Sequence, residues 1–169
     1  MEISDQDFVE GLFAKRVSNP LEWFKHSRSL LAAARSTNER ADILIDYWEK
    51  SDLENVATML YGFSLENLFK AIWTFKKFGS PHGENWIPIA EFPKELKTHN
   101  LLELARLIDK EVADEYELSL TILQDTTTWA GRYPCSIKGN EGTNIRYSQV
   151  NKDAEKIFKK YSRPFTSIS

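Results

Sequence analysis

The chain has 169 residues, of which 41% are hydrophobic and 28% are charged. These values are typical of a globular protein, and the length predicts one domain over residues 1–169, with its core from about 20 to 161. The net charge of −3 excludes the general basic field that drives non-specific nucleic-acid binding, so any contact with nucleic acid must be local.

Cysteine and histidine usage excludes two further classes of protein. The single Cys135 cannot form an intrachain disulfide, and the three histidines lie far apart in sequence, so we expect neither a structural metal nor a cofactor. The acidic start lacks the pattern of a signal peptide, and no apolar run is long enough to span a membrane. A cytoplasmic protein with no membrane contact is therefore expected.

Helix signals dominate the first half of the chain. Asn19 before Pro20 predicts an N-cap followed by proline in the first helical turn. Capping-box patterns at residues 36–39 and 51–54 predict two further helix starts. The second helix would carry apolar side chains as far as Trp48, and the third would run from about residue 53 to residue 78 and end at Gly79.

The second half predicts a long connection and then shorter helices. Residues 79–97 contain three prolines and no period, and their apolar side chains predict a loop packed over the bundle. These are Trp86, Ile87, Ile89 and Phe92. Thr98 would cap a fourth helix, a fifth would run through residues 116–123 and break at 129–134, and a last helix would stop at Pro164. Residues 136–138 and 144–147 could pair as a short hairpin. The prediction is an all-α compact bundle of four to six helices with a long Pro-containing connection.

The third predicted helix is apolar around most of its circumference, which places it in the centre of the core. Its polar residues fall within an arc of roughly 100°, at about 100° per residue. They are Glu66, Asn67, Lys70, Thr74 and Lys77. This arc is either the one wet edge of the helix or the floor of a site.

A small set of residues remains as the candidate site: Glu66 and Lys70 on this helix, His99, and Arg132 with Tyr133. No glycine-rich phosphate loop or Gly-x-Ser-x-Gly elbow accompanies them. Each has a structural alternative. Glu66 and Lys70 could form an internal ion pair, His99 could bond loop backbone, and Arg132 could pin the carbonyls of a helix end or hold a phosphate.

Three segments together resemble the bacterial HEPN-like proteins: residues 61–71, residues 97–105 and residues 129–134. Members of that family are compact bundles of four or five helices, commonly dimeric. Many act as ribonuclease toxins or as partners of small nucleotidyltransferases in defence systems. The family's endonuclease motif places an Arg a few residues before a His, and no Arg stands at that spacing before His26, His82 or His99.

The resemblance therefore implies a nucleotide- or RNA-associated binding module, non-catalytic and forming a homodimer, in a toxin–antitoxin or defence system with an antitoxin or nucleotidyltransferase partner. Glu66, Lys70, His99, Arg132 and Tyr133 would bind the ligand. The alternative is a metal-independent endoribonuclease in which His99 takes the proton of a 2′-hydroxyl and Arg132 or Lys70 stabilises the charged phosphate. A structural subunit of a larger complex is the third hypothesis.

Overall fold

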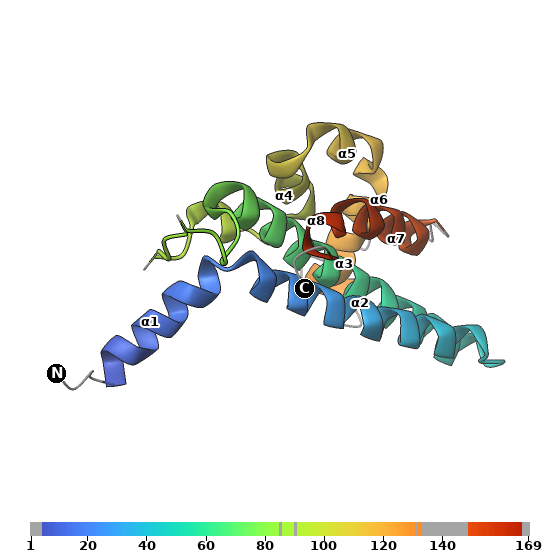
Figure 1. Ribbon diagram of the computed structural model, residues 1–169. Helices are drawn as coiled ribbons and strands as arrows, with labels where there is room; N and C mark the ends of the chain where they lie inside the picture. Colours follow the sequence, from blue (N-terminus) through green and yellow to red (C-terminus); the bar gives the residue numbers. More distant parts are fainter. Residues whose placement is uncertain (1–4, 85, 90, 131, 133–148, 167–169) are drawn as a thin grey trace.

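The structure is a computed structural model, and it describes residues 5–84, 86–89, 91–130, 132 and 149–166, with the side chains of 5–8 left out. These residues form helices and no strand, which confirms the all-α class (Figure 1). The expected hairpin at 136–147 lies outside the described residues. No helix among the described residues is long and apolar enough to cross a bilayer.

Two long helices, α2 (Pro20–Asp42) and α3 (Tyr47–Phe78), form an antiparallel hairpin that runs through the molecule (Figure 1). Asn19 caps α2 as expected, since its side chain accepts from the Leu21 amide. Small residues allow the two helices to approach closely, and Ser27 and Ser64 bond reciprocally across the contact. The hydroxyl of each donates to the carbonyl of the other, at 2.7 and 2.9 Å.

The predicted second helix is wrong, because α2 continues to Asp42 and α3 already begins at Tyr47. Both capping-box patterns lie inside helices, where a Ser and a Glu three residues apart are neighbours on one face. The real cap of α3 is Asp46, whose carboxylate accepts from the amides of Trp48 and Glu49 at 2.9 Å.

Helix α1 (Asp5–Val17) was not predicted, and it projects from the body as an arm (Figure 1). Among its described side chains, from Val9 onward, Val17 alone is buried, and Ser18 directly after the helix is buried as well. The junction is held by three hydrogen bonds: Trp23 Nε1 donates to the Val17 carbonyl, Trp86 Nε1 donates to the Ser18 carbonyl, and the Ile89 amide donates to Ser18 Oγ.

These last two contacts also show how the 79–97 connection packs. The ring of Phe92 meets Trp23 edge-on at 6.0 Å between centroids, and Leu96 in a short 3-10 helix, η1 (Lys94–Leu96), is buried. The predicted packing of the connection is therefore confirmed for Trp86, Ile89 and Phe92. It is wrong for Ile87, which is 75% exposed.

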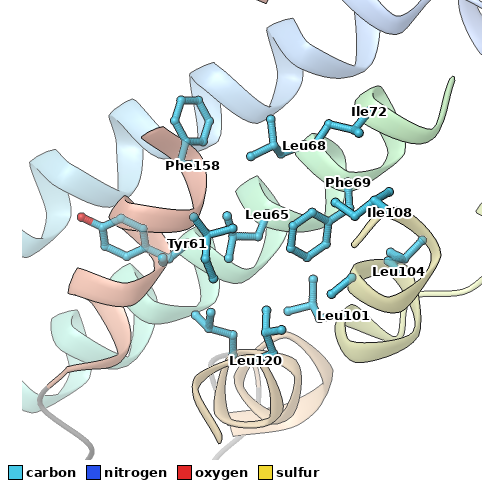
Figure 2. Close-up of a cluster of buried hydrophobic side chains, with 14 of the residues drawn as sticks. Tyr61, Leu65, Leu68, Phe69, Ile72, Leu101, Leu104, Ile108, Leu120 and Phe158 are labelled. Carbon is cyan, nitrogen blue, oxygen red and sulfur yellow. The ribbon is translucent and has the colours of Figure 1, made fainter. Parts of the chain in front are cut away.

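The remaining helices complete the bundle, and most of them pack directly against α3, as its nearly continuous apolar surface predicts. They are α4 (Leu101–Ile108), α5 (Lys110–Glu115), α6 (Glu117–Asp125), a π-helix η2 (Thr126–Ala130), α7 (Val150–Tyr161) and α8 (Arg163–Thr166). Figure 2 shows the resulting core, in which side chains of α3, α4, α6 and α7 converge. Asn100 and not Thr98 caps α4, because Asn100 accepts from the Glu103 amide.

Gly62 sets how closely α6 and η2 approach α3. A Cβ at this position would lie 2.4 Å from Thr127 Cγ2 and 3.0 Å from the Leu123 carbonyl oxygen. Only a residue without a side chain leaves room for this contact. The glycine thus places η2, and the Arg132 that follows it, beside the polar face of α3.

Candidate functional site

The candidate site lies on the polar face of α3, which is more deeply buried than an ordinary wet edge. Glu66 is 7% exposed and Lys70 3% exposed, although both side chains are ionisable. Buried charges persist where they are paired and hydrogen-bonded, so the partners of these two groups decide what the face can do.

Glu66 is the centre of the cluster, because one of its oxygens accepts from two groups. The distance from Lys70 Nζ to Glu66 Oε1 is 2.8 Å, and the distance from His99 Nδ1 to the same oxygen is 2.9 Å. The predicted Glu66–Lys70 ion pair is confirmed. The expectation that His99 bonds loop backbone is wrong, since its ring nitrogen bonds the Glu66 carboxylate.

His99 is poised between this buried carboxylate and solvent. Its side chain is 81% exposed, yet Nδ1 reaches Glu66. A carboxylate only accepts, so Nδ1 carries the proton, and in the neutral imidazole Nε2 is an acceptor open to water. The backbone on either side is fixed, since Asn100 donates its amide to Thr98 Oγ1 and caps α4 with its side chain.

Lys70 is held from a second side by an aromatic ring. Its Nζ lies 5.7 Å from the centroid of the Trp23 ring, within the range of a cation–π contact. The ammonium therefore sits between Glu66 and Trp23 and is nearly closed to solvent. It neutralises Glu66 and serves poorly as a direct ligand-binding group.

Arg132 provides the exposed cation of the site. Its guanidinium carbon lies 4.9 Å from the centroid of the Phe63 ring, and Phe63 is one helical turn before Glu66 on α3. The expected bond to helix-end carbonyls is absent among the described residues, where only the Arg132 backbone amide reaches the Trp129 carbonyl, at 2.9 Å. The side chain of Tyr133, the other candidate here, lies outside the described residues.

The other polar residues of the arc on α3 are divided between buried and exposed positions. Thr74 is fully buried, and its hydroxyl has no hydrogen-bond partner within the described part of the chain. Asn67 donates to the Phe63 carbonyl of its own helix, and Lys77 is exposed. His26 and His82 are exposed and stand apart from the cluster, as their sequence positions suggested.

Sequence reasoning missed Trp23 and Phe63 as partners of the two cations. Both look like ordinary core aromatics in sequence, and Trp23 lies on α2 and so meets Lys70 only in the folded chain. Phe63, however, falls within the same arc of the helix as the polar residues, one turn before Glu66. That spacing was the available signal for its role.

A second polar network, formed by Arg35, Tyr61 and Glu155, ties α7 to the α2–α3 hairpin. Arg35 grips the Glu155 carboxylate with two bonds of 2.7 and 2.6 Å, and the Tyr61 hydroxyl donates to it at 3.0 Å. The hydrogen bonds from Arg35 hold the pKa of Glu155 below its usual range, and burial raises the pKa of Tyr61. This network is structural, because each polar group has a partner within it.

A similar tether joins α7 to the start of α5, where the Tyr161 hydroxyl donates to Asp109, the residue that caps α5. That bond lowers the pKa of Asp109, and burial raises the pKa of Tyr161. Asp153 on α7 is buried and accepts from the Ser119 hydroxyl at 2.7 Å. These contacts tie α5 and α6 to α7.

No group of three or more His, Cys, Asp or Glu residues that could hold a metal occurs within the described residues. The site is thus built from one carboxylate, two cations and one imidazole. No protein-family model, curated protein or solved structure matches the chain.

Proposed function

We propose that the polar face of α3 binds a phosphate-bearing ligand of the nucleotide or RNA class, in keeping with the resemblance to HEPN-like proteins. One observation carries the proposal: a buried Glu66 holds both Lys70 and His99, while Arg132 lies exposed over Phe63 one turn away. With Lys70 offsetting Glu66, the cluster keeps the positive charge of Arg132. An anion is the ligand such a surface favours.

Arg132 has the geometry for two kinds of contact with a nucleotide. One face of its guanidinium lies on the Phe63 ring, which leaves the other face for a base to stack on. Its N–H groups form a planar fork that suits two oxygens of one phosphate. His99, whose Nδ1 bonds Glu66, would supply a second polar contact.

The resemblance also supports a protein partner, an antitoxin or nucleotidyltransferase of a toxin–antitoxin or defence system. This part of the proposal rests on the three sequence segments alone. Co-purification of the chain with the products of its neighbouring genes tests it, and a chain recovered alone from its native host would count against it.

Fluorescence anisotropy with end-labelled RNA oligonucleotides, competed by mononucleotides, tests ligand binding. Replacing Arg132 by Ala should weaken binding by about tenfold or more, because charge-assisted hydrogen bonds contribute roughly 1.5 to 3 kcal/mol. The control is Arg28→Ala, another exposed arginine, on the first half of α2. No binding by the wild-type chain, or equal loss in both variants, would contradict the proposal.

A second candidate function, metal-independent RNA cleavage, is favoured by the bond between His99 and Glu66. Glu66 orients the imidazole through Nδ1, so Nε2 could take the proton of a 2′-hydroxyl. The 2′-oxygen would then attack the adjacent phosphorus while the 5′-oxygen leaves and takes a proton from water. The products would be a 2′,3′-cyclic phosphate and a free 5′-hydroxyl, with Arg132 stabilising the phosphorane charge.

Incubation of RNA with the protein in EDTA distinguishes the two candidates. Cyclic-phosphate ends that disappear in His99→Gln would establish the enzyme. Binding without cleavage would leave the non-catalytic module.

A further inference from the structure

Two apolar patches lie exposed at opposite ends of α2. The arm patch is on α1 and consists of Val9, Leu12 and Phe13. The tip patch is at the connection of α2 to α3 and consists of Ile43, Ile45, Tyr47 and Trp48. Ile45 is fully exposed and Trp48 is 74% exposed, which is unusual for side chains of this size.

The arm cannot be explained by its own stability. Helix α1 has 13 residues and leaves the body at Ser18, so most of its length has no packing partner within the described residues (Figure 1). Isolated helices of this length are marginal in water. Meanwhile the hydrogen bonds around Ser18 fix the direction in which the arm leaves. A helix held outward with an exposed apolar face requires a second surface.

The two ends of α2, which carry the two apolar patches, also differ in charge. The end near the arm exposes the basic residues Lys15, Arg16, Lys25 and Arg28, with two acidic residues beside them: the exposed Glu10, and Glu22, which pairs with Lys25. The end near the tip exposes the acidic residues Glu39, Asp42, Asp46, Glu49 and Asp52, with Arg40 beside them. A partner that covers both patches must therefore be acidic at one end and basic at the other, and this chain itself has that distribution.

We propose that two copies of the chain pair with their α2 helices antiparallel, so that the arm patch of each covers the tip patch of the other. A two-fold axis makes the two contacts equivalent and brings the basic end of each copy to the acidic end of its partner. Covering both patches on both copies would remove on the order of 1,000 Å² from water, which reaches the size of a specific interface. The surface shares no residue with the Glu66 site.

The two-fold exchange makes a specific prediction for mixed variants. Phe13→Glu damages the arm patch and Trp48→Glu damages the tip patch, so either homodimer loses both of its contacts. A mixed dimer of the two variants combines an intact arm with an intact tip and keeps one of its two contacts. Direct contacts between two arms or between two tips would give no such rescue.

Sedimentation equilibrium over a range of concentrations tests this arrangement. The wild type should approach twice the 19.6 kDa chain mass, and each variant alone should dissociate about tenfold or more readily. The equimolar mixture should associate more tightly than either variant. Ile87→Glu is the matched control, because Ile87 is 75% exposed and lies outside both patches.

Both substituted side chains are exposed, so the helical signal in circular dichroism should be retained, and the milder Trp48→Ala should weaken association in the same direction. A wild-type chain that stays monomeric at all concentrations would overturn the proposal. So would a dimer that neither substitution affects, or a mixture no tighter than the separate variants.

Discussion

Replacing Glu66 by Ala should destabilise the fold strongly, because Lys70 would remain buried without its counter-charge. Breaking a buried ion pair by removing one partner costs about 3 to 5 kcal/mol. The lower end, about 3 kcal/mol, applies here, since Glu66 also faces the exposed His99 and water can enter from that side. For a chain of this length, that loss lowers the melting temperature by roughly 6 to 12 °C.

A double-mutant cycle measured by urea denaturation separates this effect from simple loss of packing. Lys70→Met alone should destabilise the protein, because it leaves the Glu66 carboxylate without its buried cation. Glu66→Leu with Lys70→Met should recover most of the loss, since a well-packed apolar pair often replaces a buried ion pair at little cost. Losses that simply add, with no recovery in the double variant, would refute the reasoning.

Three further predictions concern the scaffold and the site. Gly62→Ala should lower the free energy of unfolding by about 1 to 3 kcal/mol in thermal or urea denaturation, because the added Cβ overlaps Thr127 Cγ2. The double variant Gly62→Ala with Thr127→Ser should regain part of this loss. A Gly62→Ala protein as stable as the wild type would contradict the close approach. Because the pKa of Glu155 is lowered in the folded protein, its carboxylate stabilises the fold at pH values above its unfolded-state pKa. This stabilisation is lost as the pH falls through the folded-state pKa. The wild type should therefore lose more stability than Glu155→Gln between about pH 5 and pH 3. Parallel pH curves for the two proteins would argue against it. His99→Gln should leave the unfolding free energy within about 0.5 kcal/mol of wild type, because the His99 side chain is exposed; a larger loss would assign His99 to the scaffold.

The fold was predictable where the signal is local and repeated. The apolar surface of residues 53–78 identified the central helix, and the i, i+4 spacing of Glu66 and Lys70 predicted their ion pair. The turn between α2 and α3 was not found, because residues 43–46 contain no glycine or proline to mark it. Two Ser-x-x-Glu patterns predict helix starts that the structure does not have, because the same spacing suits a helix interior equally well.

The candidate site was only partly predictable, for a physical reason. Its members came from separate segments whose meeting depends on packing. His99 reaches Glu66 because α4, which begins just after it, packs on α3, and Arg132 reaches Phe63 because Gly62 admits the π-helix. Neither event has a signal in the local sequence. Composition and spacing could name the candidates, and only the fold could show which of them touch.

The central claim is that the His99 edge of the Glu66 cluster meets a phosphate-bearing ligand. Imidazole ¹⁵N–¹H correlation spectra, with His99→Gln to assign the resonances, test it directly. We expect His99 to carry its proton on Nδ1 in the free protein and its Nε2 signal to move when a dinucleotide is added, while His26 and His82 stay unchanged. A His99 ring protonated on Nε2, or three histidines that respond alike or not at all, would contradict the account.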